Sequence, residues 1–336
     1  MNYLHITLLF FIGLNLILIL NFSKFKLFHY NIDKPDNLRK LHLKPTPLAG
    51  GLILLINILI YWILANISND ILKDDIFFQN IKSLNIFILI VLSIFSLGFI
   101  DDKLNLKANT KFFFLLIIVL SLLFLDKNLI LENIIFSFYK KDLALNELSI
   151  FFSVFCFIVF INAFNMFDGI NLQSSSYSLF IFLNILFFYN SLFIKILIIA
   201  LLAFSYLNLK NKTFLGDSGS LLLAFIISYF FIKLYNFNYI EFADQICLYM
   251  IIPGLDLVRL FIVRIYNKKN PLSSDRLHLH HLLISRFSLT KTLFTIHFLI
   301  FIPVILGNLN MNNIYVFLFT TFIYSATVIY IKKIKN

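Results

Sequence analysis

The chain has 336 residues, of which 60% are hydrophobic and 13% are charged, and its formal net charge is +11. A soluble domain carries roughly 25% charged residues, so this composition excludes an ordinary soluble enzyme. Apolar runs of about 17–25 residues, long enough to cross a bilayer as a helix, recur along the whole chain. We therefore expect an all-α polytopic membrane protein that forms a single domain over residues 1–336.

Eleven apolar runs predict transmembrane helices. The first run is not typical of a cleaved signal peptide, because Lys24 and Lys26 follow it and no basic residue precedes it. An odd number of spans places the two termini on opposite sides of the membrane. The predicted spans are 4–20, 49–66, 84–100, 112–125, 149–165, 176–189, 192–207, 219–233, 246–263, 293–307 and 314–331.

The connecting loops alternate between two membrane faces, and one face carries most of the 28 Lys and Arg residues. Cytoplasmic loops are enriched in Lys and Arg, so we assign this face to the cytoplasm, with the N-terminus outside and the C-terminus inside. A basic surface beside anionic lipid accounts for the net charge without a nucleic-acid partner. The loops on this face are 21–48, 101–111, 166–175, 208–218 and 264–292.

The first polar motif on the cytoplasmic face covers residues 33–51 and reads DKPDNLRKLHLKPTPLAGG. Its three prolines oppose a regular helix, and Gly50 and Gly51 allow close packing at the start of the next span. The alternative is an ordinary basic loop. The basic side chains of this motif are Arg39, Lys40, His42 and Lys44.

Two adjacent carboxylates, Asp101 and Asp102, end the third predicted span, and Lys103, Lys107 and Lys111 follow them. Neighbouring carboxylates bind a hard divalent cation together, or one acts as a base while the other holds the metal. The alternative is a pair that is simply solvated at the membrane surface.

The segment INAFNMFDGIN, residues 161–171, places Asn162, Asn165 and Asp168 on one helical face before Gly169 ends the helix. Such polar groups in a membrane helix are costly unless they bind a ligand or one another. We expect a ligand-binding face, with an interhelical hydrogen-bond cluster as the alternative.

The segment FLGDSGS, residues 214–220, precedes the eighth predicted span. A helix N-terminus offers backbone N–H groups to phosphate, and Asp217 is a candidate metal ligand beside it. The alternative is a turn that only caps the helix.

Three histidines, His278, His280 and His281, follow Asp275 and Arg276 in the loop before the tenth span. Their spacing matches no standard zinc motif, and phosphate binding or acid–base chemistry fits the cluster. Within the ninth span, Asp256 and Arg259 lie three residues apart and are interpreted first as a structural ion pair. Together, the cytoplasmic motifs predict Mg²⁺-assisted phosphoryl chemistry on a lipid substrate.

Five stretches in this order resemble the polyprenyl-phosphate N-acetylhexosamine-1-phosphate transferases, glycosyltransferase family 4, over residues 33–285. The resemblance implies transfer of a HexNAc-1-phosphate from a UDP-sugar to undecaprenyl or another polyprenyl phosphate, with release of UMP. This is a first membrane step of cell-envelope polysaccharide synthesis in a bacterial inner membrane. The stretches are RKLHLKPTPLAGG, GFIDDKLNLKANTKF, INAFNMFDGIN, TFLGDSGS and SSDRLHLHH.

The last stretch resembles the branch that uses UDP-GlcNAc, which we expect to be the donor. A 6-deoxy UDP-HexNAc and UDP-MurNAc-pentapeptide stay open as alternatives, and so does a homodimer. Two rivals to the transferase are a transporter or flippase, and a binder of nucleotide sugars without catalytic activity.

The resemblance also implies roles for individual residues and a requirement for Mg²⁺, with Mn²⁺ as a substitute. The implied catalytic residues are Asp101, Asp102, Asp168, His280 and His281. The implied metal ligands are Asp102 and Asp217. The implied substrate-binding residues are Lys44, Lys111, Asn162, Asn165, Phe214, Arg276 and His278. Two departures from the family pattern are Leu172 and Ala224, each at a position where glycine is common.

Overall fold

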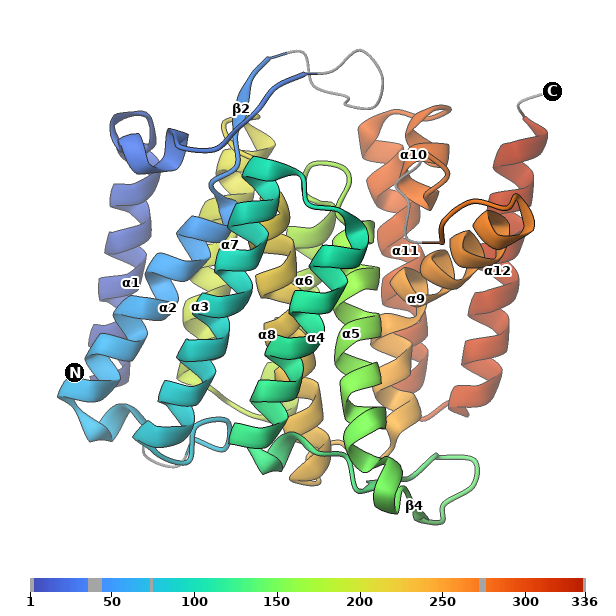
Figure 1. Ribbon diagram of the computed structural model, residues 1–336, viewed down its shortest axis with the longest axis horizontal. Coiled ribbons are helices and arrows are strands. Elements are labelled where there is room, and N and C mark those ends of the chain that lie inside the picture. Colours follow the sequence, from blue (N-terminus) through green and yellow to red (C-terminus); the bar gives the residue numbers. More distant parts are fainter. Residues whose placement is uncertain (1–2, 36–43, 73–74, 272–275, 335–336) are drawn as a thin grey trace. The chain divides into compact units, whose positions relative to one another are not determined.

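The computed structural model describes residues 3–35, 44–72, 75–271 and 276–334, and helices dominate this part of the chain (Figure 1). Residues Arg39, Lys40, His42 and Asp275 lie outside it. The helices are α1 (Tyr3–Leu20), α2 (Gly50–Ile67), α3 (Ile81–Leu104), α4 (Ala108–Leu125), α5 (Ser149–Phe167), α6 (Gln173–Phe188), α7 (Leu192–Leu209), α8 (Gly216–Asn236), α9 (Ala243–Tyr266), α10 (Leu279–Ile284), α11 (Leu289–Asn308) and α12 (Asn313–Lys333).

The remaining elements are short. Two antiparallel strand pairs join β1 (Ile32–Asp33) to β2 (Thr46–Pro47) and β3 (Asn133–Ile134) to β4 (Leu143–Ala144). Five 3-10 turns cover Phe22–Lys24, Lys26–His29, Asn69–Leu72, Lys127–Leu129 and Asn146–Leu148.

The all-α polytopic class is confirmed. Every predicted span falls on a helix, and nine helices within the described residues are long and apolar enough to cross a membrane. Segments Leu4–Leu20 and Gln173–Phe188 are shorter apolar helices, so the number eleven stays a prediction. The sidedness of the loops and termini also stays a prediction.

The chain forms two compact units. Unit 1 contains Met1–Lys127 and Ser178–Ile227, and unit 2 contains Asn128–Tyr177 and Ser228–Asn336. The boundaries fall in the 3-10 turn Lys127–Leu129 and inside α6 and α8. That residues 1–336 act as one transferase domain stays a prediction.

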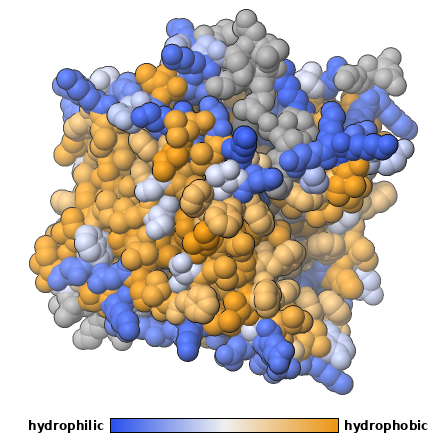
Figure 2. Space-filling model, in the orientation of Figure 1, coloured by the Kyte–Doolittle hydropathy of each residue, from blue (hydrophilic) through white to orange (hydrophobic). Residues whose placement is uncertain are grey.

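In unit 1, α7 packs against α1 and α2, and α3 packs against α2 and α4. Its core contains Phe78, Phe87 and Phe193, whose ring centroids lie 5.0–5.6 Å apart. The outer side chains are apolar as well, for example Leu89 and Phe113, and Figure 2 shows apolar residues over the middle stretches of these helices. Such exposed apolar surface suits contact with lipid chains.

In unit 2, α9 packs against α5, α11 and α12, and α10 packs against α11 and α12. Helix α9 contains Pro253 and is bent in Figure 1. Proline removes a backbone hydrogen bond and clashes with the preceding turn, which accounts for the bend. The half of α9 beyond Pro253 carries Asp256 and Arg259.

Candidate functional site

Two polar clusters, one in each unit, contain six of the thirteen predicted site residues. The carboxylate cluster of unit 1 consists of Asp101, Asp102, Lys111 and Asp217. The histidine cluster of unit 2 consists of Asp256, Arg259, His278, His280 and Tyr324.

The carboxylate cluster depends on glycines that let the start of α8 contact α2 and α3 directly. A Cβ atom added to Gly98 of α3 would lie 2.5 Å from the Cα of Ser218, and one added to Gly51 of α2 would lie 2.6 Å from the backbone nitrogen of Gly219. Real Cβ atoms do not come this close to backbone. The glycines of two sequence motifs therefore let those motifs contact the backbone of a third.

Asp102 binds the N-terminal turn of α8. Its carboxylate accepts hydrogen bonds from the backbone of Asp217 (2.6 Å), the backbone of Ser218 (3.1 Å) and the hydroxyl of Ser218 (2.8 Å). A negative side chain is stabilised at a helix N-terminus by these donors and by the helix dipole. The expectation that this turn offers free N–H groups to phosphate is therefore wrong for Asp217 and Ser218, because Asp102 already binds both.

Asp101 and Asp217 both approach the ammonium of Lys111. The Nζ atom lies 2.7 Å from Oδ2 of Asp101 and 3.4 Å from Oδ1 of Asp217. Asp101 is buried, and its other oxygen accepts a hydrogen bond from the backbone of Leu106 at 2.7 Å. Two carboxylates thus share one ammonium, and the third, Asp102, lies beside Asp217 at the start of α8. This excess of negative charge favours binding of a further cation.

These residues partly fit a divalent cation. Their oxygens are the hard ligands that Mg²⁺ takes, but the described part of the chain holds no group of three or more Asp, Glu, His or Cys residues placed to share a metal. Asp101 and Asp217 already converge on one positive centre. Asp102 would have to give up hydrogen bonds to α8 before binding metal.

Phe214 lies three residues before Asp217, and Lys44 lies four residues before Leu48. Phe214 is half-buried, and its backbone forms a parallel bridge with Leu48, which connects the 44–51 segment to the start of α8. Lys44 is exposed. Their predicted contacts with the nucleotide stay predictions.

In unit 2, the motif of residues 161–171 ends α5. Asp168 is the C-cap of the helix, and Asn162 donates to Ile158 O at 2.8 Å, so its amide turns back on its own helix. Asn165 and Asp168 are half-buried. Their roles at a nucleotide site stay predictions.

The loop after α5 contacts the histidine motif. A Cβ on Gly169 would lie 1.9 Å from Nε2 of His280, so glycine leaves the space that the imidazole fills. Leu172 has φ +68°, a left-handed conformation that favours glycine, at the position where the family resemblance predicts one. Leu172 therefore adopts the backbone conformation that a glycine would take at this position.

His280 is buried, and its ring centroid lies 4.3 Å from that of His281 and 5.5 Å from that of His278. Burial lowers the pKa of His280 well below its usual value, and the neighbouring His281 and His278 lower it further against the attraction of Asp256. His280 is therefore neutral at neutral pH. It can accept or donate a hydrogen bond, but it supplies no positive charge to a diphosphate.

His278 binds Asp256. Its Nδ1 lies 2.8 Å from Oδ2 of Asp256, whose Oδ1 accepts hydrogen bonds from Arg259 at 2.7 Å and from the Tyr324 hydroxyl at 2.7 Å. The pairing of Asp256 with Arg259 confirms the predicted ion pair. No sequence pattern marks Tyr324, which is one of several tyrosines in an apolar helix. Arg276 is exposed and His281 half-buried.

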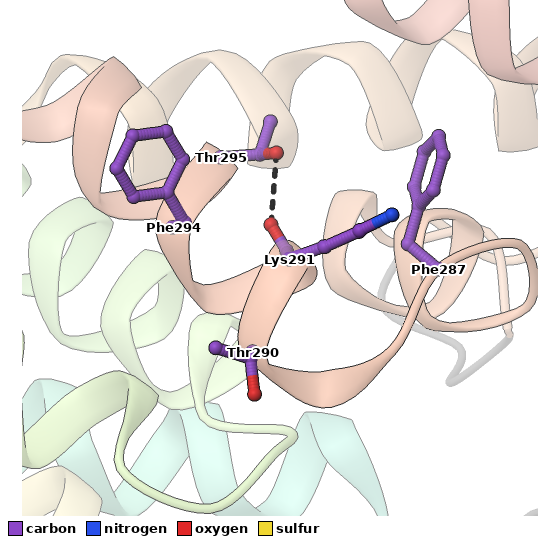
Figure 3. A pocket seen from close by; sticks show the side chains of 5 residues that line it. All are labelled: Phe287, Thr290, Lys291, Phe294 and Thr295. Carbon is purple, nitrogen blue, oxygen red and sulfur yellow. Dashed lines mark hydrogen bonds between the residues drawn. The ribbon is translucent and has the colours of Figure 1, made fainter.

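A hollow of about 370 Å³ opens at the start of α11, outside both clusters (Figure 3). Its lining includes Phe287, Phe294 and the stem of Lys291, and Thr295 donates to Lys291 O at 2.9 Å. No carboxylate or imidazole lines it. The hollow therefore lacks the groups that phosphoryl transfer requires.

This fold and these sites define a polytopic helical membrane protein that carries one acidic and one imidazole cluster. Residues 84–235 match the family described as glycosyl transferase family 4. This match covers a little under half of the chain and agrees with the family that its motifs resemble.

Relatives named undecaprenyl-phosphate alpha-N-acetylglucosaminyl 1-phosphate transferase include the following three proteins. The protein from Thermotoga maritima is 27% identical over 272 residues, which cover 78% of this chain and 76% of the relative. The protein from Salmonella typhi is 25% identical over 269 residues (75% and 69%). That from Escherichia coli K12 is 25% identical over 266 residues (75% and 69%).

Proposed function

We propose that the protein transfers GlcNAc-1-phosphate from UDP-GlcNAc to undecaprenyl phosphate and releases UMP. The product is a polyprenyl-diphospho-sugar, formed at the cytoplasmic face of a bacterial inner membrane as the first membrane step of polysaccharide synthesis. The observation that carries the proposal is the carboxylate cluster, which lies inside the segment 84–235 that matches the family. The names of the relatives support the acceptor lipid and the transferred group.

In this reaction an oxygen of the lipid phosphate attacks the phosphorus that bears the sugar. The bond from that phosphorus to the bridging oxygen breaks, and UMP leaves with the electron pair. Both reactants are anionic, so the reaction needs positive charge beside the phosphates. Lys111 brings an ammonium to this cluster and is held there by Asp101 and Asp217.

Bound Mg²⁺, or Mn²⁺ in its place, would neutralise charge on the diphosphate. Asp217 is its first candidate ligand, because its side chain is partly exposed while paired to Lys111. Asp101 is the better second ligand, because it lies with Asp217 beside the same ammonium. Asp102, the ligand that the family resemblance implies, would first have to break its hydrogen bonds to the start of α8. The full chain should lose activity on chelation of divalent cations and regain it with Mg²⁺.

The test is UMP release by purified protein in the presence of undecaprenyl phosphate and Mg²⁺. We expect release with UDP-GlcNAc that depends on the lipid and is lost in Asp217→Asn. Parallel reactions with a 6-deoxy UDP-HexNAc and UDP-MurNAc-pentapeptide decide the sugar. Absence of UMP release with every donor, from protein shown to be folded, would overturn the proposal.

A further inference from the structure

Three successive residues of the histidine motif are each bound by one buried network in unit 2. Arg259 donates to Leu277 O at 2.6 Å, Asp256 accepts from His278 Nδ1 at 2.8 Å, and Asp256 also accepts from the backbone of Leu279 at 3.2 Å. Asp256 and Arg259 come from α9, whereas the motif itself is the approach to α10. The network thus fixes both the backbone and the ring of this segment.

Tyr324 of α12 closes the network. Its hydroxyl donates to Asp256 Oδ1 at 2.7 Å and accepts from Arg259 Nε at 2.8 Å, which uses both capacities of the oxygen. Asp256 and Tyr324 are buried, with 4% and 3% exposure. A buried carboxylate with four donors has no freedom to turn, so its oxygen toward His278 is fixed in place.

The contact to Asp256 also fixes the proton on the imidazole. A carboxylate only accepts hydrogen bonds, so the Nδ1 atom of His278 carries hydrogen, and in the neutral ring Nε2 is the accepting atom. A second partner that holds one ring nitrogen is a recurrent way to set the tautomer and direction of the other. An ion pair kept only for stability would need no contact with the histidine.

We propose that Asp256 and Tyr324 are positioning residues for the transferase reaction, which act by fixing the orientation and tautomer of His278. Arg259 completes the network by holding Asp256, Tyr324 and Leu277 O. The proposal rests on the proposed function, because Nε2 of His278 is taken to contact the nucleotide sugar. It assigns a role in the reaction to α12, whose sequence carries no family motif.

The test uses the full-length enzyme and the UMP-release assay. Tyr324→Phe removes one neutral hydrogen bond, so we expect kcat/KM for UDP-GlcNAc to fall about fivefold. Asp256→Asn removes a charged partner and admits the wrong tautomer, and we expect a fall of about a hundredfold. The KM for undecaprenyl phosphate should stay within twofold, because a general loss of packing would affect both substrates. Tyr330→Phe, an exposed position on the same helix, is the matched control and should equal wild type.

A double-mutant cycle separates positioning from a structural role. If Tyr324 acts through His278, Tyr324→Phe should have no further effect on kcat/KM in a His278→Gln background. Additive losses in the cycle, or wild-type kinetics in both Tyr324→Phe and Asp256→Asn, would overturn the inference. A wild-type enzyme that releases no UMP would instead refute the proposed function. Melting temperatures identify a variant that fails to fold. If Asp256→Asn does not fold, the kinetics of the milder Tyr324→Phe variant test the inference.

Discussion

At the scale of single residues, the loop after α5 contains a leucine in a conformation that suits glycine. Leu172 has φ +68°, and a residue with a Cβ atom pays roughly 1–2 kcal/mol for the left-handed region. The preceding Gly169 is the opposite case, since its missing Cβ is the space taken by His280. A substitution at Leu172 is therefore expected to stabilise the protein, whereas one at Gly169 is expected to damage it.

Leu172→Gly should stabilise the protein by up to about 1 kcal/mol. The strain that is relieved exceeds the extra backbone entropy that glycine gives to the unfolded chain. The measurement is the melting temperature in detergent. Leu309→Gly, an exposed position with φ −83°, is the control and should destabilise. Equal destabilisation by the two changes would contradict the argument.

Gly169→Ala should abolish most UMP release. The new methyl group would occupy the position of the His280 imidazole, so the ring must leave its place beside His278 and His281. Activity and melting temperature are compared with Gly13→Ala, where the added atom meets nothing within 4 Å. The control should keep full activity and gain stability, since alanine is the better helix former. An active Gly169→Ala enzyme would show that the His280 position is not required.

At the scale of elements, the polar motifs were predictable but their contacts were not. Apolar runs indicated where helices lie, and the acidic and histidine motifs indicated the site residues. Sequence spacing contains no information on which helices pack together, so the hydrogen bonds from α8 to Asp102 were missed. The contacts of the Tyr324 hydroxyl with Asp256 and Arg259 were missed for the same reason. Nothing in an apolar run distinguishes a tyrosine that forms hydrogen bonds from one that only packs.

The two aspartates of the carboxylate cluster should therefore respond differently to removal of charge. Asp102→Asn weakens three hydrogen bonds at the start of α8 and loses the interaction with the helix dipole, so unfolding should become easier by about 1–3 kcal/mol. Asp217→Asn, with a side chain 37% exposed, should leave stability nearly unchanged while activity is lost. The pair of variants is compared by denaturation in detergent and by UMP release. Equal loss of stability in both would refute a special structural role for Asp102.

At the scale of the whole molecule, composition and the length of the apolar runs predicted the class, because a helix satisfies its own backbone hydrogen bonds inside a membrane. The two compact units could not be predicted, since no linker or shift in composition marks their boundaries inside α6 and α8. A buried histidine likewise has no sequence signature, yet it influences the stability of the folded chain as a whole.

The stability of the folded protein should fall in mild acid because of His280. Burial lowers the pKa of this imidazole in the folded state, whereas the unfolded chain has the ordinary value of about 6.5. Below that value the unfolded state binds more protons than the folded state. The contribution of His280 to the free energy of unfolding is therefore fully present above pH ~7. The free energy of unfolding decreases as pH falls toward the folded-state pKa, by at most about 1.4 kcal/mol per pH unit.

The measurement is denaturation between pH 7.5 and pH 5 for wild type and His280→Gln, in which the neutral amide cannot titrate. The variant should show a smaller decrease, and His5→Gln, at an exposed position on α1, should keep the wild-type slope. If all three proteins lost stability equally, acid sensitivity would arise elsewhere. A difference confined to His280→Gln would show that the neutral imidazole beside Gly169 is part of what holds unit 2 folded.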